Sequence, residues 1–581
     1  MSLMKEEEKP PFTQHDENTD RDHSPRGEPA NFTYGSVQFI VTFLSTSFGF
    51  YAAFLGTSPT WNMLTSNVPL ALAPSTTIAW AYPTLLFSQA LSAILLGRIS
   101  DFVGRRWVFV LGNLIAFVGF LATGRVSDAR SIVGLAVLIG IGTGIQIIGP
   151  FLALAELVPV RHRYAVVGAS LSLLAPLFAM NPAIAEALYQ NTSDSWRWPY
   201  SINAILSFVA TVGLAASYHP PTHRQLHDDP EAEHLKSKDW KGLITLAISF
   251  SLLTYFLLWG ATIYAWDTPK MIALVTVFGF VVVAFFVYEF FFGHEHSAFP
   301  PYLFRSWAVL SQIILSSLMS LLVWFIPSAI PVLFKGILSE SGMKQGWDTS
   351  CWSAGLVAGF ILASLACMRP KFVKWHLVAG IAVAMIFLSA LTATTSSRAQ
   401  MAKAFLTLSG IGQGYSLLVS GVTASLVVHR RDIGIVAGIL AAFRNLFFAI
   451  LQAVFMSIFQ PRLQNKLVKF VSGAVLEGGL PQTSLPALFE ALAAAQATGD
   501  PSALLQVPGI TPALIQTTMM EVVRATTNAW KFIFSIANIY FIGTLIIAVL
   551  AANTDRFLSL EIWAHLGNPK FKRGGQLRSK V

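Results

Sequence analysis

The sequence predicts an all-α polytopic membrane protein with fourteen transmembrane helices. Three observations support this class. The chain is 54% hydrophobic and only 12% charged, whereas a soluble domain carries about 25% charged residues. Its apolar runs reach the length of about 20 residues that crosses a bilayer as a helix. Short loops rich in Lys and Arg separate these runs. A chain with so few charges cannot cover a water-facing surface, so most of its surface must face lipid.

The apolar runs define fourteen predicted spans, and their number places both termini on one side of the membrane. The first six spans are 37–58, 76–97, 107–124, 131–157, 165–187 and 200–218. Two more follow at 241–262 and 271–292. The last six are 306–334, 350–368, 376–395, 401–428, 434–459 and 529–552.

The spans and the segments between them predict the domain organisation. Residues 1–36 are polar and acidic, which is typical of a disordered tail. Residues 460–528 contain short apolar runs broken by Gly and Pro, which favours a structured extracellular loop with one or two short amphipathic helices. The predicted order is a cytoplasmic tail (1–36), a six-helix bundle (37–218), a cytoplasmic loop (219–240), two additional helices (241–292), a cytoplasmic loop (293–305), a second six-helix bundle containing the outer loop (306–552), and a cytoplasmic tail (553–581).

The distribution of basic residues orients the chain. The loops on the side of the termini carry fifteen Lys and Arg residues, and the opposite short loops carry eight. Because basic loops stay in the cytoplasm, both termini are predicted to be cytoplasmic. Asn191 begins an Asn-Thr-Ser glycosylation triplet that this topology places outside. The net charge of +9 comes from these loops, so no nucleic-acid partner is expected.

Cysteine and histidine usage predicts neither a disulfide nor a metal site. Cys351 and Cys367 lie in one predicted helix, about 24 Å apart, which is too far for a bond within the chain. His219, His223 and His227 have helical spacing, but two prolines interrupt that helix and no cysteine joins them. No cofactor is expected. The sequence contains no catalytic constellation, so the protein is predicted not to be an enzyme.

An internal repeat relates the two six-helix sets. LIGIGTGIQ begins at Leu138 and LSGIGQGYS begins at Leu408, an offset of 270 residues. At this offset each member of a glycine triplet matches another glycine, and a later arginine and glycine match as well. The aligned pairs are Gly140 with Gly410, Gly142 with Gly412, Gly144 with Gly414, Arg161 with Arg431, and Gly168 with Gly438. The repeat predicts two halves related by an axis along the membrane normal, with the glycines allowing close helix packing.

The stretch GRISDFVGRR, residues 97–106, resembles the signature G-x-L-x-D-x-x-G-R-R/K between helices 2 and 3 of the major facilitator superfamily. The matching residues are Gly97, Asp101, Gly104, Arg105 and Arg106. The stretches ELVPVRHR, SWRWPY, FRNLFFAI and GGLPQTSLPAL resemble the fungal trichothecene efflux pump family and its siderophore-transporter relatives. This resemblance covers residues 37 to 563 and implies the major facilitator fold, with two six-helix bundles plus two extra helices.

The resemblance also implies a function. The leading expectation is efflux of a fungal secondary metabolite, mycotoxin or drug across the plasma membrane by alternating access. Two other functions remain open: uptake of a ferric siderophore, and a nutrient receptor that does not transport. A vacuolar or vesicle membrane is the alternative location. The expected partners are a small organic substrate, the lipid bilayer and protons, and the protein is expected to be a monomer. Leu138 stands where efflux relatives often carry an arginine linked to proton coupling, so coupling is less firmly implied than transport.

The same resemblance makes the loop between the second and third spans a conformational latch. The Asp101 carboxylate would pair with Arg105, or with Arg161 or Arg163 of the next inner loop, and would hold one access state. Glu156, at the end of the fourth span, would join this network. The alternative is a set of surface charges that anchors the topology and contributes little energy.

Other residues are candidates for the substrate cavity or for coupling. Arg444 lies about 15 Å into its predicted span, where a charge must face the protein interior or a wet cavity, and Asn445 adjoins it. Its alternative role is to bind backbone carbonyls. Glu186, in the outer half of the fifth span, is the leading proton carrier, or else an interfacial carboxylate. The cavity walls implied by the resemblance contribute Tyr51, Gln146, Trp324, Gln413 and Tyr415. An apolar wall with few polar groups suits an amphiphilic organic ligand.

Overall fold

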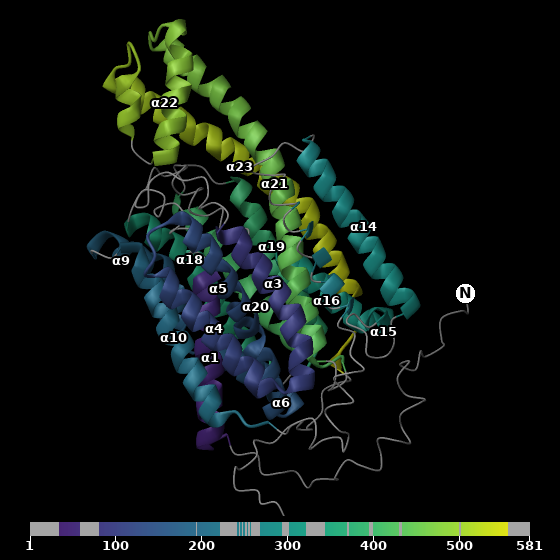
Figure 1. Ribbon diagram of the computed structural model, residues 1–581. Coiled ribbons are helices and arrows are strands. Elements are labelled where there is room, and N and C mark those ends of the chain that lie inside the picture. Colours follow the sequence, from purple (N-terminus) through teal and green to yellow (C-terminus); the bar gives the residue numbers. More distant parts are fainter. Residues whose placement is uncertain are drawn as a thin grey trace, which may run out of the picture.

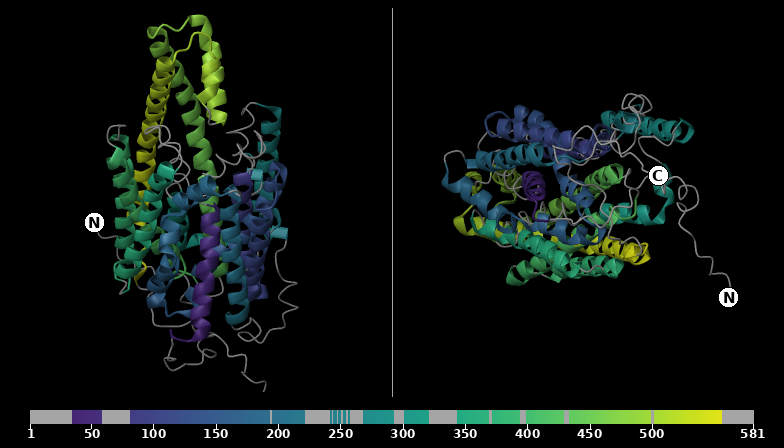
Figure 2. Two further views of the ribbon diagram at one scale, coloured as in Figure 1. Left: turned by 90° about the vertical axis from the view of Figure 1, so that its left-hand side faces the viewer. Right: turned by 90° about the horizontal axis from the view of Figure 1, so that it is seen from below.

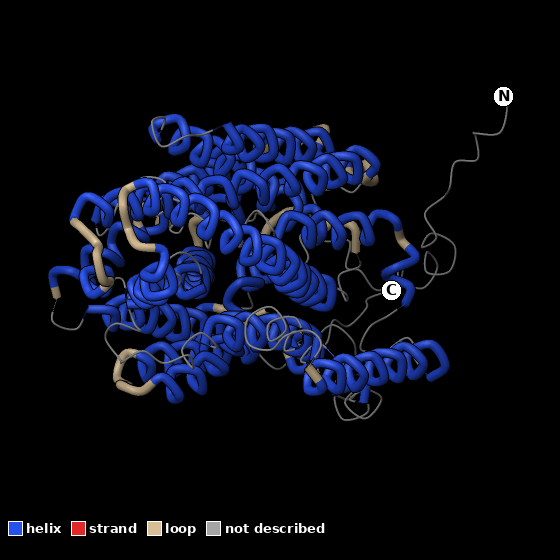
Figure 3. Tube along the Cα trace, turned by 90° about the horizontal axis from the view of Figure 1, so that it is seen from above, coloured by secondary structure: helices blue, strands red, loops and turns tan. Residues whose placement is uncertain are grey.

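Every regular element in the described part of the computed structural model is a helix, and the view from above shows these helices as one bundle (Figure 3). The described residues are 34–57, 81–192, 195–220, scattered positions between 241 and 256, 268–292, 301–320, 343–368, 371–393, 399–428, 433–498 and 501–555. Most of the predicted tails, most of the loop 219–240, most of the seventh span and Trp324 lie outside this set.

The first half of the chain follows the predicted spans closely (Figure 1). Its long helices are α1 (Val37–Thr57), α3 (Ala81–Val103), α4 (Arg105–Thr123), α5 (Ala129–Gly149) and α10 (Trp198–Ser217). The fourth span continues beyond α5 through a π-helical turn, Pro150–Leu154, into α6 (Ala155–Leu157). These elements lie within residues 37–218, the range predicted for the first bundle.

The fifth span differs from the prediction of one continuous helix. It consists of α7 (Arg163–Ser172), α8 (Ala175–Ala179) and α9 (Asn181–Asn191). Pro176 and Pro182 occupy the second positions of α8 and α9. Proline has no backbone N–H and clashes with the preceding turn, so the helix restarts at each of these residues.

The second half contains α14 (Pro269–Phe292), α15 (Pro301–Arg305), α16 (Trp307–Ser320), α18 (Met343–Ala366), α19 (Val373–Ala390), α20 (Ala399–Ala424), α21 (Ile433–Glu477), α22 (Leu485–Thr498) and α23 (Pro512–Leu550). Within the described residues, seven helices are long and apolar enough to cross a membrane by length and composition. Shorter apolar helices at Thr84–Ser100, Pro269–Phe285, Trp307–Met319 and Ile433–Phe448 coincide with four further predicted spans.

The repeat predicted at an offset of 270 residues is visible in the packing of α5 and α20. A Cβ atom at Gly140 of α5 would overlap the Leu85 carbonyl oxygen of α3. A Cβ atom at Gly410 of α20 would lie 2.6 Å from the Trp352 carbonyl oxygen of α18. Since α3 and α18 are the second helix of their respective halves, the matching glycines make equivalent contacts.

The next glycine pair faces the opposite side of the same two helices. A Cβ atom at Gly142 would overlap the Ala116 backbone of α4, and one at Gly412 would overlap the Ala384 backbone of α19. Helices α4 and α19 are the third helix of each half. Both α5 and α20 are therefore held between the second and third helices of their half by close backbone contact.

The contacts between the halves are also equivalent. At Gly168 in α7 a Cβ atom would lie 2.6 Å from the Ser364 Cβ of α18, and at Gly438 in α21 it would lie 2.5 Å from the Ala93 carbonyl oxygen of α3. The fifth helix of each half thus packs on the second helix of the other. This exchange supports an axis running along the bundle, as the repeat predicts.

The segment 460–528 extends beyond the bundle as a helical arm (Figure 2). Helix α21 continues to Glu477 and α23 already begins at Pro512, with α22 between them. Only α22 corresponds to the short helices expected here. The apolar residues Leu467, Val471 and Val475 recur every four positions and are buried in a core that belongs to the arm alone. This helical spacing explains why α21 does not end at the predicted membrane boundary.

Substitution of Gly140 by alanine should destabilise the protein by about 1–3 kcal/mol, because the new methyl group collides with backbone atoms of α3 that cannot rotate away. Gly134 lies in the same helix with nothing within 4 Å of its Cβ position, so Gly134→Ala is the matched control and should stabilise by up to about 1 kcal/mol. Thermal unfolding of both purified variants in detergent measures the difference. Equal unfolding temperatures would contradict the close packing at Gly140.

Candidate functional site

The predicted latch segment lies where α3 ends and α4 begins. At Gly97 a Cβ atom would lie 2.7 Å from the Gly434 carbonyl oxygen of α21, so this glycine allows close contact between the halves. Gly104 has a φ of 101°, a backbone conformation that favours glycine, and it joins the two helices. Asp101 lies in α3, but its side chain lies outside the described residues.

Arg105 pairs with Glu156 of α6, and both side chains are almost fully buried. The Tyr218 hydroxyl donates a hydrogen bond of 3.5 Å to the second Glu156 oxygen. Arg106 donates to the Ala215 carbonyl oxygen at 2.7 Å. The structure therefore brings Arg105 and Glu156 together, as the latch hypothesis expects, while Arg161 is exposed on the short helical turn before α7.

Arg163 lies at the contact between the halves and interacts electrostatically with Glu156 of the Arg105 cluster. Its side chain is fully buried and donates to the Ser425 carbonyl oxygen at 3.4 Å. Beside it, the Tyr164 and Thr423 hydroxyls lie 3.0 Å apart in a hydrogen bond. These bonds tie the start of α7 to the inner end of α20.

Two further polar contacts fix the inner ends of the helices. Tyr34, just before α1, bonds the His162 Nδ1 at 2.5 Å, and partial burial raises the pKa of the Tyr34 hydroxyl. Asp555, after α23, accepts backbone N–H bonds of 2.9 Å from both Phe372 and Val373 at the start of α19. A carboxylate is favourable at this position because the first N–H groups of a helix have no partner within it.

A series of side-chain hydrogen bonds connects the two halves. The Asn445 amide of α21 donates to the Gln89 oxygen of α3 at 3.2 Å, and the Gln89 amide donates to the Thr143 hydroxyl of α5 at 3.2 Å. Asn445 thus contacts the first half, whereas its neighbour Arg444 does not take part in this series of hydrogen bonds.

A cavity lined by Arg444, the neighbour of Asn445, is bounded by both halves. Its walls come from α5 and the following π-turn on one side, and from α16, α20 with the residues after it, and α21 on the other. Representative lining residues are Ile147, Ile148, Phe151, Ser316, Leu440 and Arg444. Arg444 is one of the residues predicted for a cavity that the structure places in this wall. A transport substrate must be accessible to both halves, so this cavity is the best candidate for its site.

Four predicted cavity residues instead bind within their own half. The Tyr51 hydroxyl donates to the Leu171 carbonyl oxygen at 2.9 Å, and the Gln146 amide donates to the Asn113 oxygen at 2.9 Å. In the second half, Gln413 accepts a 2.9 Å bond from the Trp352 indole, and the Tyr415 hydroxyl bonds the His376 Nδ1 at 2.5 Å. None of the four is among the residues that line the cavity.

Glu186 lies at a contact between the halves on the outer side. Its side chain is buried and accepts a 2.8 Å hydrogen bond from the Gln190 amide. A Cβ atom at Gly346 of α18 would lie 3.1 Å from the Glu186 Cβ. In the same contact the Ala183 backbone N–H donates to the Ser350 hydroxyl at 3.3 Å. Asn191, the predicted glycosylation site, is exposed at the end of α9.

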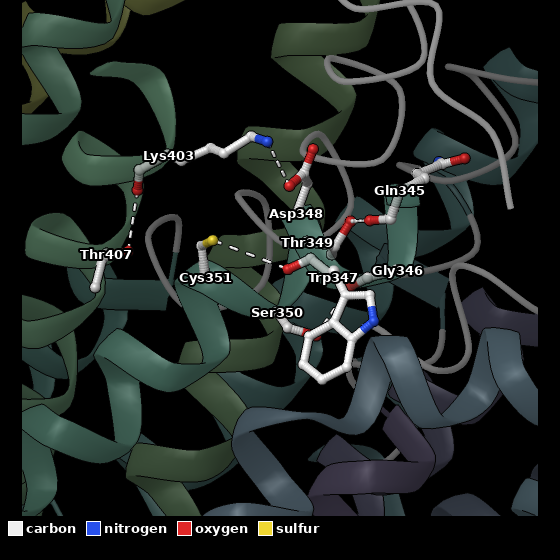
Figure 4. Close-up of polar contacts among 9 residues, drawn as sticks. All are labelled: Gln345, Gly346, Trp347, Asp348, Thr349, Ser350, Cys351, Lys403 and Thr407. Atoms are coloured by element: carbon white, nitrogen blue, oxygen red, sulfur yellow. Dashed lines mark hydrogen bonds and ion pairs between the residues drawn. The ribbon is translucent and has the colours of Figure 1, made fainter. Parts of the chain in front are cut away.

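Sequence reasoning missed an ion pair at the outer ends of α18 and α20. The Lys403 Nζ lies 2.6 Å from an Asp348 oxygen, and their side chains are only 15% and 10% exposed (Figure 4). The predicted tenth span began at residue 350, which left Asp348 outside it, whereas α18 begins at Met343. The available signal was an acid and a base at the outer ends of the tenth and twelfth spans, which are not consecutive in the sequence.

Two repeated halves, packed through equivalent helices around a shared cavity, define a secondary transporter of the major facilitator superfamily. A family model described as "Fungal trichothecene efflux pump" matches residues 29–571. The chain therefore belongs to the fungal trichothecene efflux pump family.

Individual relatives have low sequence identity, but the similarity extends over most of each chain. A protein named "Trichothecene efflux pump TRI12" from Trichoderma arundinaceum is 26% identical over 555 residues, covering 92% of this chain and 89% of the relative. Its namesake from Fusarium sporotrichioides is 24% identical, covering 84% and 80%. "Multidrug resistance protein 3" of Bacillus subtilis is 22% identical, covering 85% and 90%. Among solved structures, the proton:xylose symporter XylE superposes with a TM-score of 0.48 at 13% identity, covering 85% and 96%.

The Asp348–Lys403 pair leads to a double-mutant prediction. Asp348→Asn or Lys403→Met alone should cost about 3 kcal/mol, because each removes one member of a largely buried ion pair. The double variant should recover most of this loss, since no isolated charge remains. Thermal unfolding of the three purified variants measures the coupling. A double variant as unstable as the sum of the two single variants would show that the charges do not interact.

Proposed function

We propose that the protein exports a fungal secondary metabolite from the cytoplasm by alternating access. The observation that carries this proposal is the cavity shared by both halves, in a chain of the trichothecene efflux pump family. Contacts between the halves exist on both sides of it. Arg163 contacts Ser425 on the inner side, and Ala183 contacts Ser350 on the outer side. Opening toward one compartment requires one set to separate while the other holds.

The proposal extends to the location and state of the protein. The excess of basic residues in one set of loops supports cytoplasmic termini. We place the protein in the plasma membrane as a monomer, where export removes the metabolite from the cell; a vacuolar or vesicle membrane is the alternative. Because relatives are named for trichothecene efflux, a mycotoxin or a comparable metabolite is the substrate class to examine first.

The latch is proposed to be the network of charged residues at the inner ends of α3, α4 and α6, which includes Arg105 and Glu156. The buried pair of Arg105 and Glu156 supports this role, as does the contact of Gly97 with Gly434 of the other half one turn from Asp101. Arg106 and Gly104 fix the direction of α4, which carries Arg105 into the network.

Protons are the proposed coupling ion, with Glu186 as the carrier. Glu186 is buried on the outer side, where α9 meets α18 of the other half. A proton arriving from outside would neutralise a carboxylate at this contact. Loss of the charge lowers the cost of burying the side chain, so protonation favours the state in which the outer contact is closed.

The function is tested by accumulation measurements in a fungal host that lacks its own exporters. Cells expressing the full-length protein should retain less of at least one labelled mycotoxin than control cells, from a set that includes an uncharged trichothecene and an acidic mycotoxin, and an uncoupler should abolish the difference. Labelled ferric siderophore serves as the comparison. Increased uptake of the ferric siderophore, with unchanged retention of toxin, would overturn the export proposal.

The carrier role of Glu186 has a separate test. Glu186→Gln should remove the response of efflux to a pH gradient while substrate exchange across proteoliposomes without a gradient continues, since the amide cannot release a proton. Glu477→Gln is the matched control, because Glu477 is exposed at the end of α21. A Glu186→Gln protein that still responds to the pH gradient would assign coupling to another group.

A further inference from the structure

The wall of the cavity has one charge. Of the described residues that line it, Arg444 is the only charged one, and Ser316 and Ser425 are the only others with polar side chains. The remaining lining residues are aliphatic, aromatic or glycine. A ligand that fills this space is therefore surrounded mainly by hydrocarbon and meets a guanidinium group at one place.

No described residue neutralises this guanidinium group. The Arg444 Nε is buried and makes no hydrogen bond with any described residue. The ion pairs found among the described residues join Arg105 with Glu156, Lys403 with Asp348, and Arg524 with Glu521. A buried charge is costly unless an opposite charge or several hydrogen bonds compensate it. The site therefore favours a ligand that brings a negative charge.

The helices that line the cavity carry other buried polar atoms that make no hydrogen bond with a described residue. They are the Gln146 oxygen of α5, the Gln312 oxygen of α16, the Ser420 hydroxyl of α20 and the Asn445 oxygen of α21. None of the four residues lines the cavity, so Arg444 alone favours a charged ligand.

We infer that the cavity binds an amphiphilic organic anion, with an apolar body against Ile147, Phe151 and Leu440 and a carboxylate paired with Arg444. A carboxylate matches the fork of N–H donors that a guanidinium group presents. The inference rests on the proposed export function and adds the chemical class of the substrate. A cationic ligand is disfavoured, because it would meet the Arg444 charge within a low-dielectric wall.

The position of Arg444 also relates the ligand charge to the membrane potential. The cavity is lined from Ile433, at the end of α21 that is predicted to be cytoplasmic, to Arg444, about 16 Å further along the helix. An anion entering from the cytoplasm would reach the guanidinium group at the deep end. The potential is negative inside, so it drives an anion outward through the transport cycle.

Binding by the full-length protein in detergent tests the inference. The probes are radiolabelled naphthaleneacetic acid and naphthaleneacetamide, which share an apolar body but differ in charge. Equilibrium dialysis should show at least about tenfold tighter binding of the acid, the size expected for a buried charge pair. Arg444→Gln should bind the two probes equally, and Arg444→Lys should keep part of the preference. Arg462→Gln, on the outer part of the same helix, is the matched control and should behave like the parent protein.

The possible results separate the inference from the proposed function. Equal binding of acid and amide by the parent protein, or an unchanged preference in Arg444→Gln, would overturn the anion site even if toxin export occurs. Preferential binding of the acid without any export in cells would retain the site and refute the proposed function. In proteoliposomes, an inside-negative potential should accelerate efflux of the acid more than efflux of the amide, since the entering proton carries charge in both cases and only the acid carries a further charge. Equal acceleration would contradict an anionic substrate.

Discussion

The rest of the structure depends on close backbone contact at the glycines of α5 and α20. Lipid provides no hydrophobic force that would press one membrane helix against another, so packing distance decides which helices stay together. Gly140 and Gly142 bring α5 against α3 and α4, and Gly410 and Gly412 do the same for α20 with α18 and α19. Each half is therefore a rigid unit built around its fourth helix. The cavity can then change shape mainly by movement of one unit against the other.

The distribution of polar contacts agrees with this division. Among the described residues, two buried ion pairs, Arg105 with Glu156 and Lys403 with Asp348, each join helices of a single half. The polar contacts found between described residues of different halves are hydrogen bonds, such as Asn445 with Gln89. A net hydrogen bond contributes only about 1 kcal/mol, and a separating pair can be rehydrated. Ion pairs therefore stabilise each half, whereas weaker hydrogen bonds join the two halves. This arrangement allows the cavity to open and close repeatedly.

Hydropathy and glycine spacing predict the spans and the repeat because lipid imposes both patterns on the sequence. The interruption of the fifth span could be predicted from Pro176 and Pro182, yet the mean hydropathy of this span concealed it.

The candidate site was harder to predict from the sequence than the spans. Gln146 and Tyr51 are polar residues within spans, and sequence does not reveal whether such a side chain faces the cavity or a helix of its own half. The Asp348–Lys403 pair joins residues far apart in the chain, so only the packing of α18 on α20 brings it together.

An anionic substrate would change the energetics of coupling. Moving one elementary charge through the membrane potential yields about 2.3 kcal/mol per 100 mV. A neutral metabolite gains nothing from this source, so its export depends wholly on the coupling ion. An anion leaving and a proton entering both carry charge in the direction that the potential favours, and their contributions add.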